Sequence, residues 1–233
     1  MREPLPVVLI PGLLGSVRLY EPQLPELWRS GPVTVADPTR DDSMEAIGRR
    51  ILASAPPRFA LVGLSMGGYL SFELLRQAPE RVARLALLDT SARADTPEQS
   101  AARRTQMAQA AAGDFAAVVD AQFERLVHPS RRSDTALREA NRLMAQEVGA
   151  AAFARQQTAV MGRPDSRGQL GAIACPTLVL VGAEDQVTPP ERAREIAAGI
   201  RAARLVTVSE CGHLSTLEQP RAVNRALLEW LEL

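Results

Sequence analysis

Short apolar runs rich in β-branched residues alternate along the chain with segments of helical periodicity. The six apolar runs cover residues 5–11, 32–37, 58–63, 82–89, 177–182 and 204–209. Continuous apolar runs of this length are typical of strands that are buried on both faces of a parallel sheet. Helical segments between such strands predict right-handed βαβ units. The pattern therefore predicts an α/β protein with a doubly wound, mostly parallel six-stranded sheet.

Helical patterns fill most intervals between these runs, and several of them begin with a capping signal. The helical segments are residues 43–56, 66–82, 188–200 and 217–233. Ser43 and Thr188 are the predicted N-caps of the first and third segments, because a side-chain oxygen at this position accepts a backbone N–H. The second segment is expected to stop near Pro79, because proline cannot continue a helix.

One long interval breaks the alternation of strands and helices. Residues 92–168 contain no strand-like run and are rich in Ala, Arg and Gln. Apolar residues recur there at spacings of three and four after a predicted cap at Asp114, namely Phe115, Val118, Val119, Phe123 and Leu126. A second stripe begins with Leu137, Met144 and Val148. Since the interval is too long for a loop, it predicts a helical cap inserted into a core formed by residues 1–91 and 169–233.

The composition is that of an ordinary globular protein and excludes several classes of partner. The chain has 233 residues, 46% of them hydrophobic and 23% charged, which suits one domain or one domain with an insertion. Its 27 basic residues equal its 27 acidic ones, so charge gives no reason to expect nucleic acid or an anionic membrane. The start, "MREPLPVVLIPGLLGS", lacks the apolar core of a secretion signal, and no apolar run could span a bilayer. We therefore expect a cytoplasmic location.

A serine stands between glycines where the third apolar run meets a helix. The pattern Gly63-x-Ser65-x-Gly67 in this position is typical of a nucleophile elbow, a tight turn that exposes the serine hydroxyl. The flanking positions must be small, because the helix and the neighbouring strand pass close by. The N-terminus of the helix offers unpaired N–H groups, so the Met66 N–H can donate to a developing oxyanion. A plain glycine-rich turn is the alternative interpretation.

A serine hydroxyl is a weak nucleophile, so it needs a base that an acid holds in place. The chain has two histidines. His213 lies in a glycine-containing loop just past the sixth run, at the same sheet edge as Ser65, and is the predicted base. His128 lies in the insertion and is interpreted as a surface or packing residue of the cap.

The acid is expected between the serine and the histidine in chain order, just past the end of a strand. The sequence "VGAEDQVTP" after the fifth run offers Glu184 and Asp185, which point in different directions because they are adjacent. Asp185 is the predicted acid and Glu184 is the alternative. Asp89, after the fourth run, is a second possible acid, which we interpret instead as a turn cap at the entrance to the insertion.

The loop after the first run, "IPGLLGS", is expected to supply a second oxyanion donor. Gly12 lets the backbone turn close to the site, so the Leu13 N–H is the predicted donor and the Leu14 N–H is the alternative. A simple Pro-Gly turn is the other interpretation.

The two cysteines, Cys175 and Cys211, are interpreted as buried free thiols. One precedes the fifth run and the other follows the sixth, so they lie at opposite edges of a parallel sheet. A strand of this length separates them by about 20 Å, at about 3.3 Å per residue, which is far beyond disulfide reach.

Taken together, these motifs resemble those of the α/β-hydrolase fold superfamily. The matching pieces run along nearly the whole chain and are "IPGLLGS", "GLSMGGY", "LLDTS", "VGAEDQVTPP" and "CGHLSTLEQP". The resemblance implies a catalytic triad of Ser65, Asp185 and His213, with oxyanion donors at Leu13 and Met66. The insertion falls where such enzymes carry their cap.

The chain departs from the superfamily pattern in three places. Pro11-Gly12 stands where many relatives have His-Gly, and the loop "DPTRDDS" lacks the usual glycine-rich turn. The first run resembles the third strand of the full superfamily sheet, so we expect six parallel strands and not eight.

The resemblance implies a carboxylesterase-like serine hydrolase that cleaves small to medium carboxylic esters through an acyl-enzyme, without a metal or organic cofactor. The expected partner is a small ester or a related carbonyl compound, and the expected state is a monomer or small homo-oligomer. The predicted pocket walls lie beside the site residues and are apolar, which indicates an uncharged acyl or alcohol part: Leu14, Met66, Val187 and Leu214.

Two other functions share this machinery. A C–C bond hydrolase or enol-lactonase of the same fold acts on a carboxylate-bearing metabolite, which favours an arginine in the cap. The insertion contains several arginines, among them Arg103, Arg104, Arg125, Arg142 and Arg155. A non-catalytic ligand-binding member is the third possibility. A haloalkane dehalogenase or epoxide hydrolase would need aspartate in place of Ser65.

Overall fold

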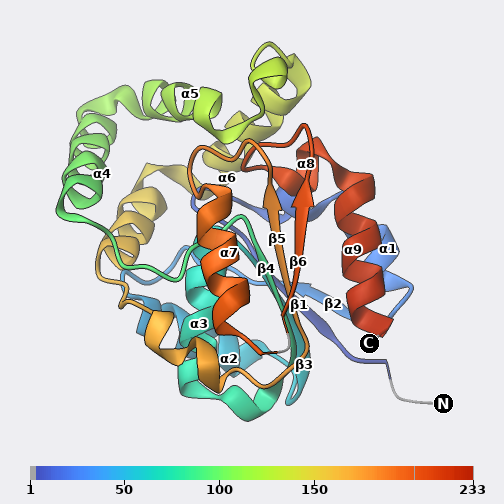
Figure 1. Cartoon of the computed structure of the whole chain (residues 1–233). Helices are drawn as coiled ribbons and strands as arrows, with labels where there is room; N and C mark the ends of the chain where they lie inside the picture. Colours follow the sequence, from blue (N-terminus) through green and yellow to red (C-terminus); the bar gives the residue numbers. More distant parts are fainter. Residues whose placement is uncertain (1–3, 202, 233) are drawn as a thin grey trace.

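A single six-stranded parallel sheet forms the centre of the molecule (Figure 1). The computed structural model describes residues 4–201 and 203–232. The strands are β1 (Val7–Ile10), β2 (Val33–Val35), β3 (Phe59–Leu64), β4 (Val82–Leu88), β5 (Thr177–Gly182) and β6 (Ala203–Val208). Their order is β2-β1-β3-β4-β5-β6, and every neighbouring pair is parallel. The predicted fold class is confirmed.

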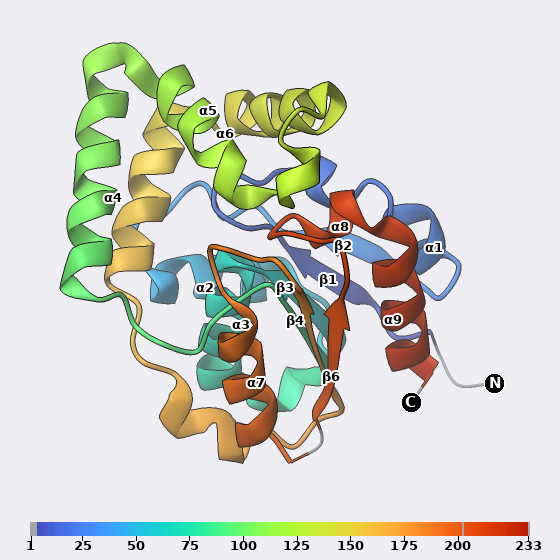
Figure 2. The ribbon, with the colours of Figure 1, turned by 45° about the horizontal axis from the view of Figure 1, so that its top comes forward.

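Helices cover both faces of the sheet, because alternate side chains of each strand point to opposite faces. The core helices are α1 (Leu24–Trp28), α2 (Met44–Ser54), α3 (Met66–Gln77), α7 (Pro190–Gly199), α8 (Ser215–Glu218) and α9 (Pro220–Glu232). Helices α2, α3 and α7 pack in one hydrophobic cluster, with Val8 and Leu61 from the sheet. Helices α1 and α9 pack in the other, with Leu9 and Val62, and they lie side by side in both views (Figures 1 and 2).

The prediction that all six strands are buried on both faces is wrong for the two edge strands. Strands β1, β3 and β5 are buried along their whole length. Strand β2 is half-buried, and most residues of β6 are half-buried or exposed. An edge strand has only one neighbouring strand and is covered less completely. Its apolar residues therefore predict a strand but do not show that the strand is fully buried.

The inserted helices stand over the carboxyl ends of the strands (Figure 1). They are α4 (Pro97–Gln109), a π-helical turn (Ala110–Asp114), α5 (Phe115–Leu126) and α6 (Thr135–Met161). The stripe predicted along α5 is confirmed, since Val118, Val119 and Phe123 are buried. Helix α6 kinks at Gly149, whose φ is 79°, so it first crosses the top of the sheet and then runs beside α4 (Figure 2). Short 3-10 turns occupy Val17–Tyr20, Pro79–Arg81, Pro129–Arg131 and Arg167–Ala172.

Two of the three predicted caps differ from the structure. Ser43 caps α2 as expected, accepting the Ala46 N–H. Thr188 is not a cap, because α7 begins at Pro190 and the Thr188 hydroxyl bonds Asp185. Asp114 holds the N-cap position of α5, yet its side chain makes no cap hydrogen bond, because the π-helical turn continues into the helix.

The C-terminal segment also differs from the expectation of one helix. Pro220 begins a new helix there, which separates α8 from α9. Among residues 4–201 and 203–232, no helix is long and apolar enough to cross a bilayer.

The turn from β3 into α3 is closed by backbone contacts that leave no room for side chains. A Cβ atom on Gly67 would lie 2.0 Å from the Ile10 carbonyl oxygen, and one on Gly63 would lie 2.2 Å from the Gly67 oxygen. Helix α3 therefore packs directly against β1 and β3. At its entrance Ser65 has φ 56° and ψ −114°, a strained conformation for a residue with a side chain.

Gly67→Ala is expected to lower the free energy of unfolding by about 1–3 kcal/mol, because the obstructing atom belongs to the backbone and cannot move aside. Gly171→Ala is the matched control, since nothing lies within 4 Å of its Cβ position. Its effect should stay below about 1 kcal/mol. Urea unfolding followed by circular dichroism measures both. Equal midpoints for the two variants would contradict the close approach of α3.

Candidate active site

The register of the sheet brings the segments that follow its strands to one edge. Ile10 is aligned with Gly63, and Leu64 with Leu88, so the loops after β1, β3 and β4 emerge together. Positive φ angles at non-glycine residues in the described chain occur only after strand ends, at Leu14, Ser65, Asp89 and Glu210. Backbone strain of this kind clusters where neighbouring structure holds a site in place.

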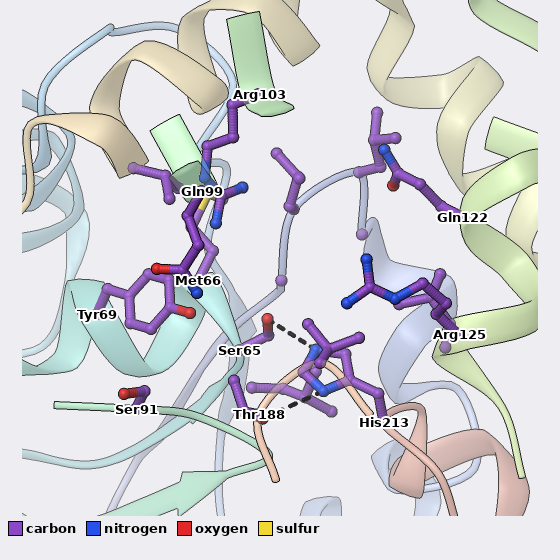
Figure 3. A pocket seen from close by; sticks show the side chains of 18 of the residues that line it. Ser65, Met66, Tyr69, Ser91, Gln99, Arg103, Gln122, Arg125, Thr188 and His213 are labelled. Atoms are coloured by element: carbon purple, nitrogen blue, oxygen red, sulfur yellow. Dashed lines mark hydrogen bonds between the residues drawn. The ribbon is translucent and has the colours of Figure 1, made fainter. Parts of the chain in front are cut away.

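Ser65, His213 and Asp185 form one hydrogen-bonded chain, and Figure 3 shows the bond between Ser65 and His213. The Ser65 Oγ lies 2.8 Å from Nε2 of His213, and Nδ1 of His213 lies 2.7 Å from Oδ2 of Asp185. His213 and Asp185 are each 3% exposed, so water barely competes for these bonds. The structure thus brings together the three side chains that the sequence pointed to.

The Asp185 carboxylate is held by backbone and hydroxyl donors of the loop that follows it. The Val187 and Thr188 N–H groups donate to Oδ1 at 2.8 and 3.0 Å, and the Thr188 hydroxyl donates to Oδ2 at 2.7 Å. Burial alone would raise the pKa of Asp185, but His213 and these donors outweigh it and hold the pKa below its usual range. The carboxylate is therefore ionised and fixed in direction.

The same ion pair acts in the opposite sense on the imidazole. Burial disfavours the charged form of His213, but the Asp185 carboxylate outweighs burial and raises the pKa of His213 above its usual range. His213 is thus an imidazole whose protonated form is stabilised while its Nε2 faces the Ser65 hydroxyl.

Two backbone N–H groups beside Ser65 are free to bind a ligand. Within residues 4–201 and 203–232, neither the Leu13 nor the Met66 N–H makes a hydrogen bond. The alternative donor is occupied, because the Leu14 N–H donates to Oε1 of Gln156 at 3.1 Å. Gly12 lies against the serine, since a Cβ atom on it would be 3.2 Å from that of Ser65.

The interpretation of Asp89 as a turn cap of the insertion is wrong. Its side chain is fully buried beside the carboxyl ends of the strands. There Oδ1 accepts the Gly182 N–H at 2.9 Å, and Oδ2 accepts the Ser215 hydroxyl. Burial, together with repulsion from the Asp185 carboxylate, raises the pKa of Asp89 to about 8. A neutral carboxyl here joins the ends of β4 and β5 to the loop of His213.

Glu184 and His128 lie away from Ser65. Glu184, the alternative acid, accepts the Cys211 N–H at 3.0 Å, and its carboxylate is 3.8 Å from Nε2 of His128. The Nδ1 of His128 accepts the Ser130 N–H, so this ring belongs to the turn after α5. Cys175 and Cys211 are free thiols, half-buried before β5 and buried after β6 respectively. No group of three or more His, Cys, Asp or Glu side chains in the described chain could hold a metal ion.

A cavity of about 280 Å³ opens between Ser65 and the inserted helices. Its lining includes all four predicted pocket residues: Leu14, Met66, Val187 and Leu214. The lining also contains polar residues that the sequence analysis did not select, from α4, α5 and α6: Gln99, Gln106, Gln122 and Asn141. This volume is near the lower end of the range of ligand pockets in proteins, roughly 300–1,000 Å³.

Two buried side chains with a structural part in the site were missed in the sequence. Gln156 of α6 binds the Leu14 N–H and also donates to the Pro38 oxygen at 3.4 Å. Glu218 accepts the N–H groups of Gly212 and Leu214, at 3.0 and 3.2 Å, on either side of His213. The sequence shows only a glutamine within the helical insertion at this position, and neither its burial nor its partner can be inferred from that.

Comparisons with known proteins agree with this geometry. Residues 40–220 match the family model described as alpha/beta hydrolase fold. The chain therefore belongs to the alpha/beta hydrolase fold family. Its structure is similar to that of a thermophilic esterase from Thermogutta terrifontis, solved with malate bound. The TM-score is 0.88 with 31% identity, and the match covers 98% of this chain and 89% of that one.

Two curated bacterial proteins are similar over nearly their whole length. A putative non-heme bromoperoxidase, BpoC, of Mycobacterium tuberculosis is 27% identical over 97% of this chain and 93% of its own. A pimeloyl-[acyl-carrier protein] methyl ester esterase of Aromatoleum aromaticum is 28% identical over 91% of this chain and 86% of its own. The family match and the two esterases indicate a hydrolase, and the names of these two curated relatives give different activities.

Asp89→Asn is expected to gain stability relative to the wild type as pH rises. In the wild type, Asp89 keeps its proton in the folded state up to about pH 8, whereas the unfolded chain releases it near pH 4, at about the usual aspartate pKa. The contribution of this group to the free energy of unfolding therefore decreases as the pH rises from about 4 to about 8. Asparagine does not titrate, so it lacks this pH dependence. Urea unfolding at about pH 5 and about pH 8 measures the difference.

Asp89→Ala provides the matched control for this experiment. It leaves the Gly182 N–H without an acceptor and should lose about 1–3 kcal/mol even at the lower pH. If the gap between Asp89→Asn and the wild type is the same at both pH values, the raised pKa is contradicted.

Proposed function

We propose that this protein is a serine hydrolase that cleaves small carboxylic esters through an acyl-enzyme. The observation that carries the proposal is the hydrogen-bonded chain from Ser65 through His213 to Asp185, at the mouth of a small cavity. An esterase at 31% identity with the same overall structure supports the choice of ester chemistry.

The geometry supports the following mechanism. The Ser65 Oγ attacks the ester carbonyl while Nε2 of His213 takes its proton and then passes it to the leaving alcohol. Asp185 orients the imidazole and stabilises its charged form. The Leu13 and Met66 N–H groups bind the oxyanion, each contributing about 3 kcal/mol in mechanisms of this type. Water, activated by the same imidazole, then releases the acid and frees Ser65.

The alternative of a C–C bond hydrolase or enol-lactonase shares these steps and stays a prediction. One observation favours it: a cap arginine, Arg125, lines the cavity, as a carboxylate-bearing metabolite would require. A non-catalytic ligand-binding role also stays open, and the complete hydrogen-bonded chain speaks against it.

Hydrolysis of p-nitrophenyl esters from acetate to palmitate tests the proposal. We expect turnover of the shorter esters, because the cavity is small. Ser65→Ala should abolish turnover, while Ser133→Ala, at an exposed serine of the cap, should leave it unchanged. If a folded wild-type protein turns over none of these esters, the alternatives take precedence.

The pH dependence of kcat/KM tests the role of His213 separately. A protonated imidazole cannot accept the serine proton, and Asp185 raises the pKa of His213. Activity should therefore fall on the acid side with its half-maximum above the usual histidine value of about 6.5. Asp185→Asn should move this half-maximum to lower pH and reduce kcat by about 10³-fold or more. If the half-maximum of wild-type kcat/KM lies at a pH below the usual histidine pKa, the stabilisation of protonated His213 by Asp185 is contradicted.

A further inference from the structure

The cavity beside Ser65 is lined by cations and by no anion. Its lining contains no aspartate or glutamate among the described residues, although acidic and basic residues are equal in number over the whole chain, at 27 each. Five arginines line it: Arg93, Arg103, Arg125, Arg163 and Arg192. A cavity with one sign of charge favours ligands of the opposite sign.

Three of these arginines form ion pairs with two carboxylates that do not line the cavity. Arg93 pairs with Glu195 at 2.7 Å. Arg103 and Arg163 share Asp95, at 2.7 and 2.5 Å. Each of the three guanidinium groups is already engaged in an ion pair, so they are poorer candidates than an unpaired arginine for holding a substrate anion.

Arg125 has no such partner. Within residues 4–201 and 203–232 its side chain makes no hydrogen bond or ion pair. This side chain points from α5 into the cavity that Ser65 and His213 line (Figure 3). Its position relative to the site is fixed by the next residue. The Leu126 carbonyl accepts the N–H groups of His213 and Leu214, at 2.9 and 3.1 Å. The last turn of α5 is thereby fastened to the histidine loop.

Arg192, the other arginine of the cavity lining without an ion-pair partner among the described residues, is less suited to this task. It follows Glu191 directly in α7, and Glu195 lies three residues further along on the same helical face. The Glu195 carboxylate lies close enough for Arg192 to lower its pKa, although its ion-pair partner is Arg93. Arg125 follows Glu124 directly in α5 but forms no ion pair with it, and the residue one turn earlier on the same helical face is Gln122.

We propose that Arg125 binds a carboxylate on the substrate, so that the preferred substrates are small esters that carry a carboxylate group. This inference rests on the proposed esterase function. A guanidinium presents paired N–H donors that match the two oxygens of a carboxylate. Gln122, which lines the same wall and points into the cavity beside Arg125 in Figure 3, offers an amide donor for the same group. The expectation of an uncharged substrate, drawn from the apolar walls alone, is replaced by this proposal.

Pairs of esters that differ only in a terminal carboxylate test the proposal. Monomethyl adipate is compared with methyl hexanoate, which places the carboxylate on the acyl side. The anion of 4-acetoxybutanoic acid is compared with butyl acetate, which places it on the alcohol side. In the wild type we expect kcat/KM to favour the anionic member of at least one pair by about tenfold or more, the scale of a hydrogen bond to a charged group.

Arg125→Gln should remove this preference mainly through a higher KM for the anionic esters, with a smaller change for the neutral esters. Arg125→Lys should keep part of it, since the charge remains while the paired donors are lost. Added salt should weaken the preference of the wild type and what remains of it in Arg125→Lys, and should have no such effect on Arg125→Gln. Arg104→Gln is the matched control, because Arg104 is an exposed arginine of α4 that does not line the cavity.

Three outcomes separate this inference from the proposed function. Turnover of neutral and anionic esters with equal efficiency, unchanged in Arg125→Gln, overturns the role of Arg125 and leaves the esterase intact. Absence of turnover on every ester overturns the proposed esterase function. In that case, binding is measured with Ser65→Ala, which should not consume the ligand. Monomethyl adipate should raise its Tm, and should not raise that of Ser65→Ala/Arg125→Gln; equal shifts in both variants overturn the carboxylate site.

Discussion

The strained conformation of Ser65 is the constraint on which the rest of the site depends. A φ of 56° at a residue with a side chain persists only because neighbouring groups fix both of its peptide units. The Ser65 N–H donates to the Leu88 oxygen at 2.9 Å, and its carbonyl accepts the Thr90 hydroxyl at 2.7 Å. Glycines at positions 63 and 67 let α3 approach β1 and β3 closely enough for this turn. The exposed hydroxyl and the free Met66 N–H both result from it.

The inserted helices belong to the site as well as covering it. Helix α6 reaches the loop after β1 through Gln156, whose amide oxygen holds the Leu14 N–H and leaves the neighbouring Leu13 N–H free. The end of α5 accepts hydrogen bonds from the backbone on either side of the His213 Cα, through the Leu126 carbonyl. Movement of the cap would therefore change the oxyanion loop, the histidine loop and the position of Arg125 together.

Three buried carboxyl groups lie within this small region, and their surroundings separate their states. Asp185 accepts three hydrogen bonds from its own loop and faces His213, so it is ionised. Asp89 lacks a cation of its own, and its pKa of about 8 keeps it neutral at pH 7. Burial also raises the pKa of Glu218, although backbone N–H groups around His213 donate to it. One carboxylate thus holds the imidazole, while the other two organise the backbone around it.

The sequence by itself determined the sheet, since each strand lies within two residues of its expected range. It also determined which side chains meet at the carboxyl edge, because parallel strands and chain order leave Ser65, Asp185 and His213 few alternatives. It did not reveal Gln156, the burial of Asp89, or the direction of Arg125. These three features depend on contacts between residues up to 142 positions apart in the chain. The local pattern of apolar and polar residues does not encode such contacts. Composition likewise gave a neutral chain, and only the tertiary structure gathered five arginines and no acidic residue around one cavity.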